Sequence, residues 1–463
     1  MRTEEILPLF ADAIRGTDEN HTRGPVRRSI ALLAIPMMLE MLMEAIFAVT
    51  DIFFVARLGS AAVAAVGMTE AVLTLVYAVA IGLSAATTAM VARRIGEGDK
   101  SGASVAAAQA LWIGALVSAL MGIAGIILGE QILTWLGADQ EVVVGGSIYT
   151  KILLGGSASI TYLFLINAIF RGAGDASIAM KSLALANGIN IILNPLLIFG
   201  VGPFPELGIT GAAIATTTGR SVGVVYQFVL LGGGKHRVTL GLRNLAIVPS
   251  VMRRLLVLSA NGIMQFAIAT SAWIMLMTIV ARSGTAAVAG YTIAMRIVEF
   301  IILPAWGLSN AAATLVGQAL GAGKATRAQL AVAITARYNF IFMMLIGVVF
   351  IVIPDPFVRI FSGDPVVVAY GSDCLQYLAY GYGFYALGMV MVQALNGAGD
   401  TFTPMIINLI CFWLIQLPLA WSLAETAGFG ARGVFAAITV AESLIALFAF
   451  AVFRSGKWKT RTV

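Results

Sequence analysis

The sequence predicts an all-α integral membrane protein, with twelve transmembrane helices arranged as two parallel six-helix repeats. Two observations lead to this fold class. Hydrophobic residues make up 59% of the 463 residues and charged residues only 11%, whereas soluble chains carry roughly 25% charged residues. The second half of the chain also repeats the first half. An internal duplication within so apolar a chain is characteristic of transporters.

The duplication has a constant offset of 225 residues, so no net insertion separates the matched points. Short motifs carry it in both halves. Arg57, Gly59 and Ala61–Ala64 recur as Arg282, Gly284 and Ala286–Ala289, Gly82–Ser84 as Gly307–Ser309, Gly96 and Gly98 as Gly321 and Gly323, Gly172–Asp175 as Gly397–Asp400, and Gly208 as Gly433.

Twelve apolar segments are long enough to cross a bilayer as helices, which takes about 20 apolar residues. They are continuous runs rather than the alternating ten-residue strands of a membrane barrel, which excludes a β-barrel. They lie near residues 29–54, 70–92, 104–128, 143–169, 176–201, 208–232, 254–280, 292–317, 328–353, 367–394, 401–424 and 433–453.

The distribution of basic residues predicts the orientation of the chain in the membrane, because connections on the cytoplasmic side are enriched in Lys and Arg. One set of connections holds most of them: Arg27, Arg28, Arg93, Arg94, Lys100, Arg171, Lys181, Lys235 to Arg254, Lys324, Arg327 and Arg454 to Arg461. The other set is richer in acids: Glu130, Asp139, Glu141, Glu206, Asp355, Asp364 and Glu425. We therefore expect a multi-pass protein of the cell (inner) membrane with both termini in the cytoplasm.

The spans and connections divide the chain into five parts. We expect a cytoplasmic N-terminal segment over 1–28, an N-lobe of six helices over 29–232 and a cytoplasmic linker over 233–253. A C-lobe of six helices over 254–453 and a cytoplasmic tail over 454–463 follow. Since each lobe has an even number of spans, both lobes point the same way and are related by a pseudo-two-fold axis along the membrane normal.

Three acids occupy the first span. At 100° per residue, Glu40, Glu44 and Asp51 fall within about 40° of one another on the helix surface. A carboxylate at the bilayer centre costs about 2.5–3.5 kcal/mol even on insertion scales, so this stripe must face a bundle interior or an aqueous cavity. It predicts a proton or cation site, because like charges so close favour protonation of at least one of them. The alternative for Glu40 is a structural pair with a basic side chain.

The fifth span adds a polar face to the same lobe. Asn187, Asn190 and Asn194 share one side of the helix, and the following proline frees backbone carbonyls. Asn side chains can donate to a carboxylate, and their oxygens together with the freed carbonyls suit Na⁺, so Asp51, Asn190 and Asn194 form a possible sodium site. Asn167 and Tyr149 are expected to complete the network. The alternative is hydrogen bonding that only joins the helices.

Other buried polar residues predict a substrate cavity. Gln265, Gln393 and Met264 are expected to line it together with Asn187. At the repeat offset the acids become Gln265, Ala269 and Leu276, so a coupling carboxylate belongs to the N-lobe.

No catalytic constellation is present. The two histidines, His21 and His236, lie in polar segments, and there is no phosphate-binding Gly-x-x-x-x-Gly-Lys-Ser/Thr loop. We expect a protein that is not an enzyme, uses no cofactor and has H⁺ or Na⁺ as its coupling ion. Its expected partners are small organic substrates and the lipid bilayer, with no nucleic acid. Each chain holds a full transport path, which predicts a functional monomer.

From about residue 29 onward the chain resembles the multidrug and toxic compound extrusion (MATE) family. The residues that carry the resemblance are Pro36 to Asp51 with Arg57-Leu58-Gly59, Arg171 to Asp175, Asn190 to Pro195, and Val316 to Lys324. The resemblance implies the two-lobed fold of the MATE and MOP superfamily, alternating access, and export of organic, often cationic, compounds in exchange for H⁺ or Na⁺. Asp51 matches the family's first-span aspartate, and Asn190 matches a polar fifth-span position.

Further residues indicate a branch of the family. Tyr149 and Asn167 fall where the DNA-damage-inducible (DinF-like) branch has network members, although that branch often has an aspartate in place of Asn194. The norfloxacin-exporter-like branch has acids where this chain has Ala269 and Tyr385. We therefore expect a chain closer to the DinF-like branch. The alternative function is a lipid or lipid-precursor flippase of the same superfamily, which the acidic stripe disfavours because an anionic headgroup requires a basic cavity.

Overall fold

The computed structural model describes residues 6–461. The first five and the last two residues of the predicted terminal segments lie outside the described residues. Long helices cover all twelve predicted spans: α2 Val26–Val55, α3 Ser60–Glu97, α4 Lys100–Trp135, α5 Gln140–Gly155 with α6 Ser157–Ala173, α7 Ala176–Phe199, α8 Gly208–Gly232, α9 Pro249–Ala281, α10 Thr285–Gly321, α11 Ala325–Val352, α13 Pro365–Gly397, α14 Phe402–Asn408 continued by η4 Leu409–Gln416, α15 Leu417–Trp421 and η5 Ser422–Thr426, and α16 Ala431–Ser455.

Short helices occupy the termini and connections. They are α1 Ile6–Arg15, η2 Ala56–Leu58, η3 Leu242–Leu245, α12 Asp355–Arg359 and η6 Lys457–Thr460. Between residues 6 and 461, eleven helical segments are long and apolar enough to span a membrane. The predicted sixth span, α8, is not among these eleven, since it carries Arg220 and Gln227 among its apolar residues. It packs along α7 over much of its length.

The fourth predicted span is present as Gln140–Ala173 and contains a one-residue turn at Gly156, between α5 and α6. One local prediction is corrected. Arg171 was assigned to a connection, but it lies inside α6 with only 8% of its surface exposed. The helix continues to Ala173 because the left-handed Gly174, with φ 94°, supplies its C-cap.

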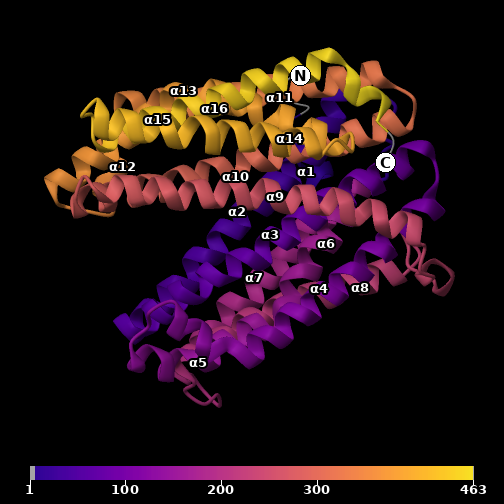
Figure 1. Cartoon of the computed structure of the whole chain (residues 1–463). Coiled ribbons are helices and arrows are strands. Elements are labelled where there is room, and N and C mark those ends of the chain that lie inside the picture. The colour runs from indigo at the N-terminus through magenta and orange to yellow at the C-terminus, as the bar shows by residue number, and fades with distance from the viewer. Residues whose placement is uncertain (1–5, 462–463) are drawn as a thin grey trace.

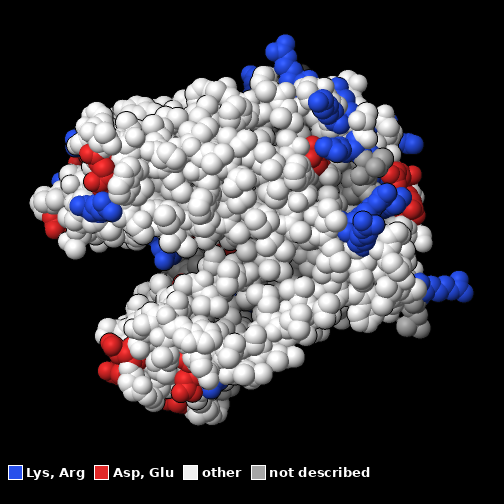
Figure 2. All heavy atoms as spheres, viewed as in Figure 1, with Lys and Arg blue, Asp and Glu red and all other residues white. Residues whose placement is uncertain are grey.

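The helices form two lobes arranged as a V (Figure 1). Helices α2 to α8 make the N-lobe and α9 to α16 make the C-lobe, and each lobe has its own apolar core. In the space-filling view a cleft separates the lobes at one end (Figure 2). Most of the visible Lys and Arg gather at the opposite end, where the lobes meet, which we call the basic end.

The lobes cross at the basic end, where α2 packs on α10 and α9 packs on α3. Glycine permits the closest approaches. A Cβ on Gly96 would lie 2.1 Å from the carbonyl oxygen of Gln318, and a Cβ on Gly321 would lie 2.1 Å from the carbonyl oxygen of Arg93. These four residues exchange places at the 225-residue offset. Such reciprocal contacts are typical of a two-fold interface. The two sequence repeats are therefore related in the fold by a pseudo-two-fold axis.

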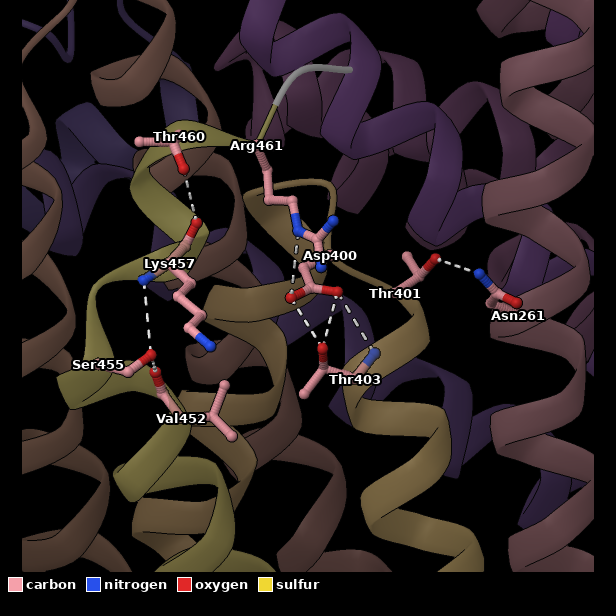
Figure 3. A network of polar contacts seen from close by, with 9 residues as sticks. All are labelled: Asn261, Asp400, Thr401, Thr403, Val452, Ser455, Lys457, Thr460 and Arg461. Carbon is pink, nitrogen blue, oxygen red and sulfur yellow. Dashed lines mark hydrogen bonds and ion pairs between the residues drawn. The ribbon is translucent and has the colours of Figure 1, made fainter.

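The aspartate of each Gly-Ala-Gly-Asp motif contacts the segment that follows the last helix of its own lobe. In the N-lobe, Asp175 lies 3.7 Å from His236, just beyond α8. In the C-lobe, Asp400 lies 3.6 Å from Arg461, just beyond α16 (Figure 3). His236 and Arg461 are themselves one repeat apart, so linker and tail fold back on their own lobes in the same way.

We predict that Gly96→Val destabilises the protein, because the new side chain overlaps the backbone of the facing lobe. Overpacking of this kind costs about 1–3 kcal/mol. Gly67→Val is the matched control on the same helix, since no atom lies within 4 Å of a Cβ at Gly67. Thermal unfolding in detergent measures both variants. Equal melting temperatures for the two would contradict the close crossing at Gly96.

Candidate functional site

The three acids of α2 all point into the N-lobe, but each has different partners. Over the eleven residues from Glu40 to Asp51 the helix rises about 16 Å. Along it the acids form three polar layers, which are completed by side chains from α3, α6, α7 and α8.

The Asp51 layer contains only neutral partners. Asn194 and Thr216 each donate to Asp51 Oδ1 at 3.1 Å. Asn190 Oδ1 accepts from Asn194 at 3.1 Å, and its Nδ2 donates to Thr216 Oγ1 at 3.0 Å. All four side chains are buried. The layer is therefore a closed ring of hydrogen bonds around one carboxylate.

The Glu44 layer contains a buried arginine from α8. Arg220 donates to the Tyr77 hydroxyl at 2.6 Å and lies 3.8 Å from Glu44. Its guanidinium also stacks over the Phe47 ring, with Cζ 4.6 Å from the centroid. A cation over an aromatic face is stabilised by the ring quadrupole. Arg220 thus balances the charge of Glu44 inside the lobe.

The Glu40 layer is an ion pair. Arg171 donates to Glu40 Oε1 at 2.6 Å, and Asn167 donates to the same oxygen at 2.8 Å. Gln227 of α8 donates to Asn167 Oδ1. Glu40 thus forms the pair with a basic side chain that was the alternative prediction for this residue.

Asp51 therefore differs from the other two acids, because no Lys or Arg of the described chain forms an ion pair with it. Beside it, the buried Oδ1 of Asn194 accepts no hydrogen bond from any described residue. A carboxylate whose hydrogen-bond partners are all uncharged, beside an unpaired amide oxygen, offers groups that a proton or a sodium ion can bind. The residues fit either ion.

The C-lobe has an amide network at the corresponding depth. Gln265 donates to the carbonyl oxygen of Thr401 at 3.0 Å and to Asn396 Oδ1 at 3.3 Å. Gln393 accepts from Asn396 at 3.1 Å and donates to Asn310 Oδ1 at 2.6 Å. At the repeat offset, Gln265 and Asn396 replace Glu40 and Arg171, so a neutral pair stands in place of the ion pair.

The other layers have no polar counterpart in the C-lobe. Asp51, Asn194 and Thr216 correspond to Leu276, Leu419 and Ala441. Leu276 belongs to the main apolar cluster of that lobe, Leu419 packs against it, and Ala441 is fully buried. The Asp51 layer thus has no counterpart at the repeat-related positions of the C-lobe.

Comparison with known proteins identifies the family. The MatE family model matches twice, at residues 36–196 and 262–422, once in each repeat. These matches cover more than half of the chain. This protein belongs to the MATE family. Members of this family are transporters and not enzymes, and the present chain is a multi-pass membrane protein.

Relatives of known description span nearly the whole chain. It is 28% identical over 450 residues to the probable multidrug resistance protein NorM of Thermotoga maritima, covering 95% of this chain and 94% of the relative. It is 28% identical to the FAD transporter of Shewanella oneidensis, covering 92% and 93%. A solved structure, described as the outward-facing conformation of a multidrug resistance MATE family transporter of the MOP superfamily, superposes with a TM-score of 0.88 at 25% identity, covering 95% and 98%.

Within this MATE fold, the remaining predicted site residues lie in different places. Asn187 donates to the carbonyl oxygen of Met43 at 2.8 Å and so connects α7 to α2 between Glu40 and Glu44. Tyr149 is buried in an apolar cluster, and its hydroxyl makes no hydrogen bond to the described Asp51 layer. Met264 is half exposed beside Gln265 on α9. The roles of all these residues stay predictions.

Sequence reasoning missed five members of the N-lobe network: Arg220, Thr216, Gln227, Tyr77 and Arg171. Arg220 carried the same signal as the acids, namely a charge within an apolar run, and could have been found by the same argument. Thr216 and Gln227 carried no comparable signal, because neutral polar residues are common in membrane helices.

We predict that Arg171→Met destabilises the protein strongly, since it leaves Glu40 buried without a counter-charge. Breaking a buried pair in this way costs about 3–5 kcal/mol, and the double variant Glu40→Gln with Arg171→Met should recover most of the loss. Chemical unfolding in detergent measures these effects.

The control is Arg432→Met in the C-lobe. Arg432 lies 2.6 Å from Asp373, which matches the distance of the Arg171 pair, but its side chain is 59% exposed. An exposed pair contributes at most about 1 kcal/mol. An Arg432→Met loss as large as that of Arg171→Met would show that burial is not the reason for the effect.

Proposed function

We propose that this MATE transporter is a multidrug efflux protein. It exports organic, cationic or amphipathic compounds by antiport with H⁺ or Na⁺, through alternating access between its two lobes. The names of its relatives support the multidrug function, since the Thermotoga protein is described as a probable multidrug resistance protein. The observation that carries the coupling proposal is the Asp51 layer, a buried carboxylate held only by amides and a hydroxyl.

The proposed orientation in the membrane follows from the charge distribution. The cleft opens away from the basic end (Figure 2). By the positive-inside rule the basic end faces the cytoplasm. We propose the inner membrane as the location. The proposed conformation is therefore outward-facing, with both termini inside. The superposition on a structure described as outward-facing supports this assignment.

In the proposed cycle Asp51 alternates between ion and substrate. When the cleft faces outward, Asp51 with Asn190 and Asn194 takes up H⁺ or Na⁺, and the neutralised site releases a cationic substrate. When the cleft faces inward, the ion leaves and the restored negative charge attracts the next substrate. A ligand moves such an equilibrium only by its different affinities for the two states, so ion and substrate must bind antagonistically.

Pro36 gives α2 a place to bend during this cycle. It lies inside the helix, one turn before Glu40, and removes a backbone hydrogen bond there. Neutralising Asp51 weakens its hydrogen bonds to α7 and α8, which frees the distal half of α2 to move about that point.

The substrate class is proposed from the charge of the lobe. The described N-lobe interior carries the three acids of α2 and the half-buried Glu70 of α3 against Arg171 and Arg220, so it favours a cation over the anionic headgroup that a flippase would move. The FAD transporter among the relatives makes an anionic nucleotide a second substrate to test. We also propose that the chain works as a monomer and is closer to the DinF-like branch, because among the acids of α2 the one without an ion-pair partner in the described residues, Asp51, lies in the N-lobe beside Asn190 and Asn194.

We predict that Asp51→Asn abolishes ion-driven transport. The experiment uses purified protein in liposomes loaded with rhodamine 6G or FAD, with a proton gradient and a sodium gradient imposed separately. Wild-type efflux under one gradient should fall in the variant to the level of liposomes without protein, because the amide cannot exchange a proton or supply a charge.

Asp373→Asn is the control, since it removes a carboxylate of the C-lobe that is paired with an exposed arginine. Its transport should equal that of the wild type. Wild-type rates in Asp51→Asn would contradict the coupling proposal, and transport of FAD without transport of the dye would contradict the cationic substrate class.

A further inference from the structure

The basic end contains two chain segments that reach from one lobe to the other. One precedes α2, the first long helix of the N-lobe, and the other precedes α9, the first long helix of the C-lobe. Neither segment belongs to the ion site. Each is bound through its backbone by the third long helix of the opposite lobe.

The first segment is residues 16–25, between α1 and α2. Arg327 of α11 donates to the carbonyl oxygens of His21 at 2.9 Å, Arg23 at 2.9 Å and Gly24 at 2.7 Å. Lys324, which precedes α11, donates to the carbonyl oxygen of Thr22 at 2.9 Å. Two basic side chains of the C-lobe therefore bind four successive carbonyls of an N-lobe segment.

The same segment is also fixed to its own lobe. His21 Nε2 lies 3.2 Å from the carbonyl oxygen of Gly174, and Arg237 donates to the carbonyl oxygen of Glu19 at 2.6 Å. Burial lowers the pKa of His21 to about 4, with Arg237, Glu19 and Arg327 as the charges that face it. The ring is thus neutral at physiological pH and its Nε2–H can donate to Gly174. Because the segment is held on both sides, it cannot follow one lobe without releasing the other.

The second segment is residues 245–248, directly before α9. Gln109 of α4 donates to the carbonyl oxygen of Ala246 at 2.8 Å and accepts from the amide of Val248 at 3.0 Å. Trp112, one turn further along α4, donates to the carbonyl oxygen of Leu245 at 3.0 Å. Here side chains of the N-lobe bind the backbone of the segment that leads into the C-lobe.

The two arrangements correspond under the pseudo-two-fold axis. Helices α4 and α11 occupy the same place in the two repeats, and so do the segments before α2 and α9. The side chains differ, since one arrangement uses charged donors and the other uses an amide and an indole. The shared feature is therefore the geometry of a helix of one lobe that binds the backbone leading into the other.

We propose that these segments are a pair of cross-lobe clasps that hold the basic end shut, and that this end opens only when both release. The proposal rests on the alternating access of the proposed function. It adds the contacts that set the equilibrium between the shut and the open basic end. Hydrogen bonds between side chains and backbone carbonyls suit this task, because water replaces them when they break and the clasps can close again. The Arg327 clasp is the stronger of the two, since its bonds are charge-assisted.

The experiment measures the state of each end directly, by electron spin resonance distances between spin labels on the protein in lipid nanodiscs. Labels at Ser101 and Thr326 report on the basic end, and labels at Glu141 and Val366 report on the cleft end. Each pair is related by the repeat offset and all four side chains are exposed. The buried Cys374 and Cys411 are replaced by Ala.

Arg327→Ala should add a population with a longer basic-end distance and a shorter cleft-end distance, and raise the ratio of open to shut basic ends by about tenfold. Gln109→Leu should act in the same direction with a smaller effect and provides an independent test should Arg327→Ala fold poorly. Arg454→Ala, which removes a positive charge at the same end but touches neither clasp, should leave both distances unchanged.

Wild-type distances in both clasp variants would overturn the proposal. So would an equal shift in Arg454→Ala, because the cause would then be the charge of the basic end. No substrate or ion gradient is needed for these distances, so a failure of the clasps is distinguishable from a failure of the transport proposal.

Discussion

Three carboxylates on one membrane-spanning helix must be balanced within the lobe, and this requirement organises the N-lobe. The bilayer supplies no water to hydrate them, so partners have to come from neighbouring helices. Helix α6 supplies Arg171 for Glu40, and α8 supplies Arg220 for Glu44. For Asp51, α7 and α8 supply only amides and a hydroxyl. Among the three acids of α2, Asp51 is thus the one without an ion-pair partner in the described residues, and this difference is why we propose it as the charge that exchanges ions.

The duplication explains why the two lobes have the same frame and different chemistry. Gly96 and Gly321 make equivalent contacts with the opposite lobe, so the crossing depends on residues that both repeats have kept. The polar layers do not repeat in this way. Gln265 and Asn396 replace an ion pair by an amide pair, while Leu276 replaces the aspartate outright. The N-lobe therefore holds the proposed ion site, and the C-lobe has a neutral amide network in place of the Glu40 ion pair.

Much of the fold could be predicted from the sequence because its signals are long-range and repeated. The apolar runs predicted the membrane-spanning helices, and the constant offset of 225 residues predicted the symmetry between the lobes. The break at Gly156 was missed although Gly155-Gly156-Ser157 signals a turn, because glycine is also frequent inside membrane helices. The stripe of Glu40, Glu44 and Asp51 was predictable from helical periodicity, and so was the shared face of Asn190 and Asn194.

The partners of the acids were harder to predict, since they depend on which helices pack together. Arg171 was placed in a connection because it lies near the end of an apolar run. The ring of Tyr149 lies among apolar side chains, and its expected place in the network stays a prediction. The clasps at the basic end left no trace in the sequence, because the groups that Arg327 and Gln109 bind are backbone carbonyls, which every residue has.

The central claim is that ion and substrate compete for Asp51, and equilibrium binding tests it most directly. The measurement is the affinity of purified protein for rhodamine 6G by fluorescence polarisation, over a range of pH and sodium concentration. The account predicts that affinity falls as H⁺ or Na⁺ rises, and that this dependence disappears in Asp51→Asn. An affinity that is independent of both ions in the wild type, or a dependence that survives in Asp51→Asn, would contradict it.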